Sequence, residues 1–408
     1  MFKIDTQVSI PSDQNYFTQS HIRKHTDILG RYYTPIAIAK IMCEVTGKFQ
    51  NKSVIDLGCG TGNLIEGALH VWKECNFHAF DVDFNALEIL LNKGKPNVSI
   101  FQLDIINSTN FKLKYQVGIS NPPYTYYERN NILYLDNQSP LDEELLKLKK
   151  IPAPFLFLRH LTTCIQKDGY ISIILPNGLL SNKLYSGIRE ILIKNYTILK
   201  VISLQKKTFE KTETNAHILI LKLKKPKNSY SIQYFSLKDM KLNEGFLRKS
   251  TNCIERLDFQ YQQNCFSKDS SKISDFIDNI YRGNIHSKAI KSENLNIFHS
   301  TDFTKDSVEI PSKFYKSTNL NYKFAESGDI LIARVGRNFF KKIALVKNGN
   351  IYISDCIIVL KPKKGFSKYL LDYLRSKNGQ FFLENISHGT GAKHINFKQL
   401  INIPIIKE

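Results

Sequence analysis

The sequence lacks the features of several protein classes. Its 408 residues contain no apolar run long enough to cross a bilayer. The seven cysteines are odd in number and scattered, with no C-x-x-C pair and no histidine at ligand spacing, so we predict neither a disulfide framework nor a metal site. Residues 1–20 carry Asp5 and Asp13 where a signal peptide requires an apolar core. We therefore expect a reduced, cytoplasmic protein with no membrane partner.

Acidic side chains are also scarce. The chain has 37 Asp+Glu against 57 Lys+Arg, a formal net charge of +20. Such an excess repels itself in the folded state, and it favours an acidic partner such as nucleic acid. The alternative is that lysine is simply the default surface residue of this protein. With 42% hydrophobic residues the chain can fold on its own, and its length favours two domains.

Short apolar runs alternate with amphipathic stretches between residues 53 and 223, which is typical of βα units around a parallel sheet. The expected strands are 53–57, 77–80, 98–102, 116–120, 170–175, 199–204 and 217–223. Helical periodicity is found at 34–46, 62–72, 84–91, 154–166 and 183–193. We predict an α/β domain over residues 1–228 with a Rossmann-like, seven-stranded sheet. Residues 229–408 should form a second, mixed α+β domain with a helix over 369–385.

A glycine run at 58–62 directly follows the first expected strand. Glycines at such a turn let the backbone approach a ligand, and the next helix points its N–H groups at that ligand. The dinucleotide fingerprint G-x-G-x-x-G is not matched, because Asn63 stands where its third glycine should be. Asp56, two positions ahead of Gly58 and Gly60, instead makes the run similar to the loop that binds S-adenosylmethionine. An ordinary strand-to-helix turn is the alternative.

Acidic residues follow the next two strands. An acid at the end of the second strand, Asp81, can accept hydrogen bonds from both hydroxyls of a ribose, and Val82 can cover an adenine ring. Asp83 fits the N-cap of the following helix, so the ribose is assigned to Asp81. Asp104, after the third strand, is the candidate acceptor for the adenine amino group, with a capping or surface role as the alternative.

The most specific motif is the tetrad Asn121-Pro122-Pro123-Tyr124, immediately after the fourth strand. An aromatic amine is a weak nucleophile because its lone pair is delocalised into the ring. The Asn121 side-chain oxygen and the Pro122 carbonyl can accept both of its protons and direct the lone pair at an electrophile. Proline fixes the backbone without adding a competing N–H group. Tyr124 offers a face on which an extruded base can stack. A rigid proline turn after a strand is the alternative.

In this order of motifs, residues 30–223 resemble the TaqI-type, gamma-class DNA adenine-N6 methyltransferases. The resemblance implies methyl transfer from S-adenosylmethionine to N6 of an adenine flipped out of double-stranded DNA. It assigns Thr34, in the segment G-R-Y-Y-T-P at 30–35, to the methionine carboxylate, and Asn121 to the cofactor site as well as to catalysis. Phe209 matches the family's second stacking aromatic, with a packing role as the alternative. The family's place in restriction-modification systems leaves open whether a companion restriction endonuclease is a partner.

The second domain resembles one target-recognition half of a type I restriction specificity subunit. The matching stretches are 328–336, 354–359 and 389–396, which are specific only in combination. Cationic and polar side chains near these glycines can approach a phosphate backbone, although any single one is more often a solvated surface charge. The DNA-binding candidates are Arg334, Arg337, Lys341, Lys342, Lys393 and His394.

Four other functions share parts of this pattern. A protein glutamine-N5 methyltransferase also uses N-P-P-Y, but a peptide substrate does not need a large basic domain. An RNA adenine-N6 methyltransferase is disfavoured by the likeness to a specificity subunit. A DNA-binding module with a vestigial catalytic half is disfavoured by intact Asp56, Asp81 and 121–124. A cytosine-C5 methyltransferase is excluded, because it needs a Pro-Cys nucleophile and the sequence has no such dipeptide.

Overall fold

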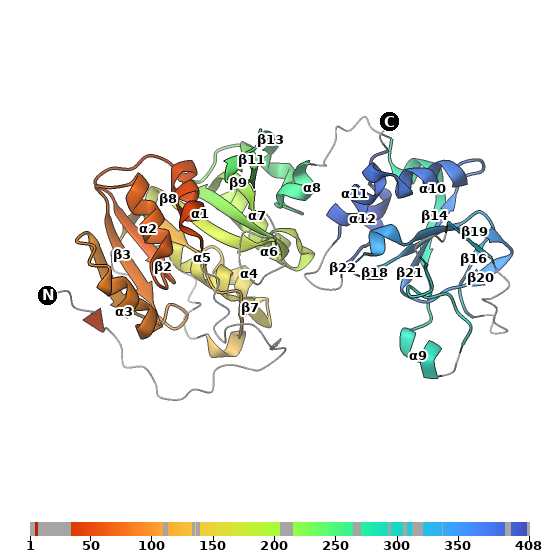
Figure 1. Cartoon of the computed structure of the whole chain (residues 1–408), viewed down its shortest axis with the longest axis horizontal. Helices are drawn as coiled ribbons and strands as arrows, with labels where there is room; N and C mark the ends of the chain where they lie inside the picture. Colours follow the sequence, from red (N-terminus) through yellow and green to blue (C-terminus); the bar gives the residue numbers. More distant parts are fainter. Residues whose placement is uncertain are drawn as a thin grey trace. The chain divides into compact units, whose positions relative to one another are not determined.

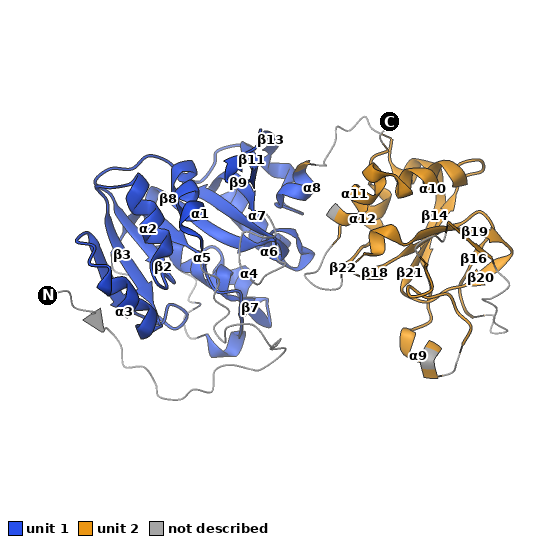
Figure 2. Cartoon of the chain, in the orientation of Figure 1, with its two compact units in different colours: residues 1–262 blue, residues 263–408 orange. Residues whose placement is uncertain are grey.

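The structure is a computed structural model in which residues 5–6, 34–108, 113–132, 135, 139–204, 215–263, 271–292, 295–304, 308–311, 321–336, 338–387 and 393–405 are described. The chain divides into two compact units, Met1–Gln262 and Gln263–Glu408 (Figure 2). Each unit has buried apolar residues of its own, and each is therefore described by itself.

One large sheet organises the first unit. Its strands in the described residues are β1 (Asp5–Thr6), β2 (Ser53–Leu57), β3 (Asn76–Asp81), β4 (Val98–Gln102), β5 (Tyr115–Ser120), β8 (Ile165–Pro176), β9 (Thr197–Leu204), β10 (Ala216–Lys222), β11 (Ser231–Lys238), β12 (Lys241–Leu242) and β13 (Phe246–Lys249). They lie in the order β1-β4-β3-β2-β5-β8-β10-β9-β11-β12, with β13 paired to β11 (Figure 1). The five central strands, β4, β3, β2, β5 and β8, are parallel to one another. Strand β10 is antiparallel to both of its neighbours, β8 and β9. All seven predicted strands are present, and the α/β fold class is confirmed.

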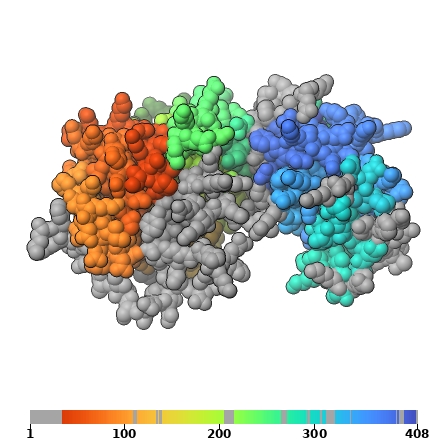
Figure 3. Space-filling view, viewed as in Figure 1, coloured from red at the N-terminus to blue at the C-terminus, as the bar shows by residue number. Residues whose placement is uncertain are grey.

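Helices cover both faces of this sheet. They are α1 (Ile36–Thr46), α2 (Asn63–Val71), α3 (Phe84–Asn92), α4 (Asp142–Leu146), α5 (Ala153–Cys164), α6 (Asn177–Ser181), α7 (Ser186–Asn195) and α8 (Phe259–Gln263), with short 3-10 turns η1 (Arg129–Asn131), η2 (Lys183–Tyr185) and η3 (Ser250–Asn252). Apolar side chains of α1, α2 and α3 share one buried cluster with the sheet, and those of α4 to α7 share the other. In Figure 3 the red and orange atoms at the left belong to the N-terminal part of the first unit, which includes α1 and α2. A small hairpin of β6 (Tyr126–Glu128) and β7 (Lys150–Pro152) lies beside the sheet.

The boundary between the units differs from the expected one at residue 228. After the polar stretch 224–229 the chain returns to the sheet, where β11 pairs in parallel with β9. Ile232 and Tyr234 of β11 are completely buried in the core of the first unit. This pairing joins segments far apart in sequence, and it moves the division to Gln262.

Buried polar contacts hold residues 250–262 against the rest of the first unit. Arg189 of α7 is fully buried and donates hydrogen bonds to the carbonyls of Ile254 and Glu255 as well as to two carbonyls near its own helix. Because burial disfavours its charge, the pKa of Arg189 is lowered to about 10. Arg256 and Asp258 form a buried ion pair, with Nε 2.7 Å from Oδ1.

The same segment contacts the start of β10. The backbone N–H of Phe259 donates to Nε2 of His217 at 3.2 Å, and His217 is completely buried. Burial lowers the pKa of His217 to about 4, more than the nearby charge of Asp258 raises it. The imidazole is therefore held neutral as a hydrogen-bond acceptor.

The second unit is a mixed α+β structure. Its strands in the described residues are β14 (Ile277–Arg282), β15 (Glu309–Pro311), β16 (Phe324–Glu326), β17 (Ile330–Ala333), β18 (Val335–Gly336), β19 (Ile343–Asn348), β20 (Asn350–Tyr352), β21 (Ile357–Pro362) and β22 (Lys393–His394). Five form a sheet in the order β14-β21-β17-β19-β15, while β16 pairs with β20 and β18 with β22. The helices and turns are η4 (Ile273–Phe276), α9 (Ser287–Ser292), η6 (Phe339–Lys341), α10 (Ser367–Arg375), α11 (Lys377–Asn385) and α12 (Phe397–Ile401).

The single helix predicted over 369–385 is wrong, because the chain forms α10 and α11 instead. Ser376 separates them with an extended conformation, ψ 164°, and its hydroxyl accepts a hydrogen bond from the N–H of Gly379 at 3.1 Å. Serine competes with the helix for backbone groups in this way and favours caps over helix interiors. Among the described residues, no helix has the length and apolar character needed to traverse a bilayer.

Candidate active site

The glycine loop between β2 and α2 is folded back tightly. The N–H groups of Gly58 and Cys59 donate to the carbonyl of Phe80 at 2.8 and 3.0 Å. Gly58 has φ +71°, and a Cβ atom there would lie 2.8 Å from the ring of Phe157. Gly62 has φ +85° and begins α2, where a Cβ would meet Leu90 at 2.4 Å. A side chain at either position would be strained, and at Gly58 it would also enter the space that Phe157 borders.

Asp81 ties the loop to the end of β3. Its Oδ2 accepts from the N–H of Gly60 at 2.7 Å, and its Oδ1 accepts from the N–H of Asp83 at 2.9 Å. Burial raises the pKa of the Asp81 carboxyl, and these two backbone donors oppose that shift. The side chain of Asp83 accepts from the N–H of Asn85 at 3.0 Å, which confirms its predicted role as the N-cap of α3.

Thr34 and Asn121 meet although 87 residues separate them. Asn121 Nδ2 donates to Thr34 Oγ1 at 2.9 Å, and Asn63 Nδ2 donates to the Thr34 carbonyl at 3.0 Å. Thr34 precedes α1, Asn63 begins α2 and Asn121 follows β5. The carboxyl ends of parallel strands lie at one edge of a sheet, and this brings the three side chains together.

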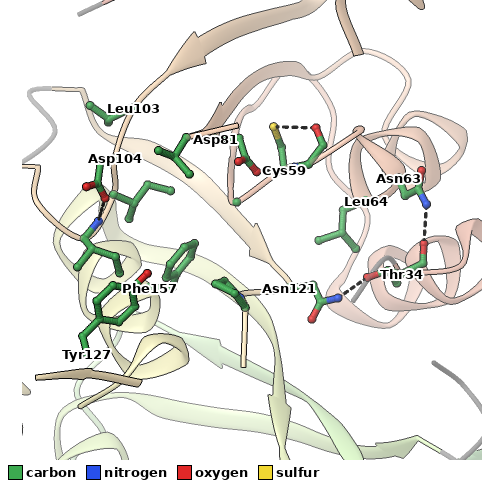
Figure 4. A pocket seen from close by; sticks show the side chains of 16 residues that line it. Thr34, Cys59, Asn63, Leu64, Asp81, Leu103, Asp104, Asn121, Tyr127 and Phe157 are labelled. Carbon is green, nitrogen blue, oxygen red and sulfur yellow. Dashed lines mark hydrogen bonds between the residues drawn. The ribbon is translucent and has the colours of Figure 1, made fainter. Parts of the chain in front are cut away.

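These elements enclose one pocket, with about 850 Å³ of empty space when its open mouth is included. Figure 4 shows Thr34, Asn63 and Asn121 on one side of it and Leu103, Asp104 and Tyr127 on the other. The lining residues are Thr34, Gly58, Cys59, Gly60, Asn63, Leu64, Asp81, Val82, Leu103, Asp104, Ile105, Ile106, Asn121, Pro123, Tyr127 and Phe157.

Most residues predicted for the cofactor line this pocket, but Asp56 does not. Its side chain is completely buried behind the loop, and neither carboxyl oxygen has a hydrogen-bond partner among the described residues. Burial raises the pKa of Asp56 well above its ordinary value, and the nearby charge of Asp81 adds to the shift. Direct contact with a ligand in the pocket, expected from the sequence, is therefore not seen in this geometry.

The pocket also contains residues that the sequence did not single out. Phe157 of α5 stands against Gly58, and nothing in a periodic apolar helix distinguishes it from core residues. Tyr127 lies near Asp104, and its pKa is raised by burial and by the Asp104 charge. Pro123 and Tyr127 both line the pocket, on either side of a bend at Tyr124.

The remaining tetrad residues lie outside the pocket wall. Pro122 is buried and Tyr124 is half-buried, and neither lines the pocket. Asp104 does line it, and its carboxylate accepts from the N–H of Ile106 at 3.0 Å and from Asn107 Nδ2 at 2.9 Å. Val82 is 43% exposed and presents its methyl groups to the pocket. Phe209 lies outside the described residues.

In the second unit, the structure brings together basic candidates that are 60 residues apart in sequence. Strand β18 pairs with β22, with Val335 opposite His394, and the N–H of Ile395 donates to the Arg334 carbonyl at 3.2 Å. Arg334 Nε also donates to the carbonyl of Asp355 at 3.0 Å. His394 is exposed, and Lys393 occupies the neighbouring position of β22.

Two further basic candidates lie at the C-terminal end of η6. Lys342 Nζ donates to the Ser300 carbonyl at 2.7 Å, and exposed Lys341 lies 5.9 Å from the Phe340 ring centre. Arg337, residues 30–33 and residues 389–392, which belong to the predicted motifs, lie outside the described residues.

Comparison with known proteins places this chain in a family. The family model described as N-6 DNA Methylase matches residues 14–306. The modification methylase CviBIII of Paramecium bursaria Chlorella virus NC1A is 24% identical over 391 residues, covering 92% of this chain and 93% of that protein. The release factor glutamine methyltransferase of Buchnera aphidicola subsp. Schizaphis graminum is 26% identical over 167 residues, or 36% of this chain and 59% of that protein.

A solved structure resembles the chain in fold. The type IIG restriction endonuclease BpuSI matches with a TM-score of 0.50 and 14% identity, covering 93% of this chain and 59% of that one. The family model spans the glycine loop, the N-P-P-Y tetrad and the start of the second unit. The chain therefore belongs to the N-6 DNA methylase family, and it is a DNA adenine-N6 methyltransferase.

Proposed function

We propose that the chain methylates N6 of an adenine rotated out of double-stranded DNA at a specific sequence, in the manner of the TaqI-type gamma class. The observation that carries the proposal is the junction of Asn121 with Thr34 at the mouth of the glycine-loop pocket. It puts the end of the N-P-P-Y strand beside the space that would hold a methyl donor.

The pocket fits S-adenosylmethionine. When bound, this cofactor supplies a methyl group made electrophilic by its sulfonium. Asp81 would accept from the ribose hydroxyls, while Val82 and Phe157 would cover the adenine ring. Thr34 and Asn63, at the opposite side of the pocket, would hold the methionine end. The close approach of Gly58 to Phe157 supports this fit, because a larger residue there would fill the space.

Asn121 and Pro122 would prepare the amine. The bond from Asn121 Nδ2 to Thr34 fixes the amide plane, and with it the direction of Oδ1. Oδ1 and the Pro122 carbonyl would each accept one N6 proton, which turns the nitrogen lone pair toward the methyl group. Tyr124 would support the extruded adenine by stacking. Asp56, buried behind the loop, would act only by shaping it.

The second unit would read the DNA sequence, as a domain like half of a type I specificity subunit. The pairing of β18 with β22, which brings Arg334 near His394, supports this role, because such groups can contact phosphates and base edges. The modification methylase CviBIII aligns over nearly the whole chain, which supports membership of a restriction-modification system. A companion endonuclease would then be a functional partner.

The test is to express the chain in a host without DNA methylation and to sequence the host DNA by a single-molecule method that detects modified bases. We expect N6-methyladenine at one short sequence, and none with the matched Asn121→Ala variant. Unmodified DNA together with methylated glutamine in a host protein would replace this proposal with the glutamine reaction.

A further inference from the structure

An exposed aromatic ring stands next to the catalytic tetrad. Tyr126 is 59% exposed, more than any other aromatic side chain in the described part of the chain. Single exposed apolar residues are common and need no explanation. Tyr126 differs because both of its sequence neighbours are held in place beside the site. Tyr127 lines the pocket, and the carbonyl of Thr125 accepts a hydrogen bond from the N–H of Ala153 at the start of α5.

Tyr126 lies outside the cofactor pocket, as Tyr124 does. Pro123 and Tyr127 line the pocket, whereas Tyr124 and Tyr126 do not. The backbone bends at Tyr124, and Tyr126 begins β6 two residues later. Tyr126 is thus close in the chain to Tyr124, the residue that would receive the extruded base.

The backbone of Tyr126 is held by the pairing of β6 with β7, where Tyr126 lies opposite Pro152. Tyr126 is also near Tyr185: burial raises the pKa of the Tyr185 hydroxyl, and Tyr126 adds to that shift. Tyr185 is itself buried, with its ring centre 5.1 Å from that of Phe155. The backbone at Tyr126 is therefore ordered before a ligand binds, which lowers the entropy cost of binding.

The neighbours of Tyr185 extend the same surface. Leu184 is 64% exposed, and Lys183 is exposed and forms no ion pair with the described residues. An aromatic ring, an aliphatic side chain and a cation together match the base, sugar and phosphate of one nucleotide.

We infer that Tyr126 stacks on a base that flanks the extruded adenine. This inference rests on the proposed function. Rotating an adenine out of the duplex removes a stacking partner from each neighbouring base. The Tyr126 ring replaces one of these partners, while Leu184 contacts the sugar and Lys183 the phosphate of the same nucleotide.

The test is a double-mutant cycle between protein and DNA, using the methylation site mapped for the wild-type enzyme. Binding affinity and single-turnover rate are measured for wild type, Tyr126→Ala, Tyr126→Phe and Tyr126→Leu. The duplexes carry either the intact site or an abasic analogue at one flanking position, 5′ or 3′. Ile89→Ala, which removes an exposed side chain of α3, is the matched control.

On intact DNA we expect Tyr126→Ala and Tyr126→Leu to bind about ten- to a hundredfold more weakly than wild type, from the usual worth of base stacking. Tyr126→Phe should stay within about threefold, because it keeps the ring. With the abasic analogue at the stacked position, all the variants should bind alike. A purely structural role would lower binding equally on both DNAs and would overturn the inference, as would coupling at neither flank. Wild-type enzyme that methylates no DNA would instead refute the proposed function.

Discussion

Acid should destabilise the first unit through His217, and the size of the effect follows from its burial. The imidazole accepts the Phe259 N–H, and its pKa is about 4 in the folded chain against an ordinary 6.5. Between these values the unfolded chain binds a proton that the folded chain does not. The stabilisation is therefore complete above pH 6.5 and is lost as the pH falls toward 4. The loss amounts to about 2 kcal/mol at pH 5 and about 3 kcal/mol at pH 4.

The assay is urea unfolding followed by tryptophan fluorescence. Trp72 is the only tryptophan of the chain and is completely buried in the first unit, so its emission reports that unit alone. The free energy of unfolding is compared between wild type and His217→Gln from pH 7 to pH 4. The glutamine oxygen can still accept the Phe259 N–H but does not titrate, so the variant should lose about 2 kcal/mol less than wild type at pH 5.

Asp258 does not account for the same pH range. Although burial acts to raise its pKa, the charge and hydrogen bonds of Arg256 hold the pKa of Asp258 below its ordinary 3.8, so its contribution is lost only at lower pH. His70→Gln, an exposed substitution on α2, should follow the wild-type curve throughout. Parallel curves for wild type and His217→Gln between pH 7 and 5 would refute a neutral, buried imidazole.

Three further predictions concern the site and the unit boundary. Asp81→Ala removes the acceptor that holds the Gly60 N–H, so calorimetry should show S-adenosylmethionine binding weakened about ten- to a hundredfold; unchanged affinity would remove Asp81 from the cofactor site. Asn121→Ala should lower the single-turnover methylation rate at least ~100-fold while cofactor affinity stays within a few-fold, and a surviving rate would contradict its proposed role. A chain ending at Asn228 should fail to give the cooperative urea transition of Trp72 fluorescence that a chain ending at Gln262 gives, because β11 and two carbonyl partners of Arg189 are missing from the shorter one; equal transitions would show that this segment is dispensable.

Local patterns predicted the elements of the catalytic unit well, because each strand, turn and cap is encoded by neighbouring residues. The glycine loop after β2 and the capping role of Asp83 are of this kind. What the sequence did not reveal depends on contacts between distant segments. In the sequence Phe157 resembles the other apolar residues of α5, and only the fold brings it against Gly58. Strand β11 was missed because the polar stretch before it has the composition of a linker between domains.

The second unit shows the same limit. Each of its basic candidates is an unremarkable surface charge in the sequence, and only the pairing of β18 with β22 brings Arg334 and His394 together. The break between α10 and α11 was missed for another reason. Ser376 is compatible with a helix interior by propensity alone, and its capping bond to Gly379 decides the outcome.

The buried contacts of Arg189 and Asp258 all lie within residues 1–262. Every hydrogen bond of Arg189 described above, and the ion pair of Asp258, is completed within the first unit. A crossover between two related genes just after this point would exchange the whole second unit and leave the core of the first unit intact. If the second unit reads the DNA as proposed, an exchange at this point would change the sequence that is methylated without disturbing the buried contacts of the catalytic unit.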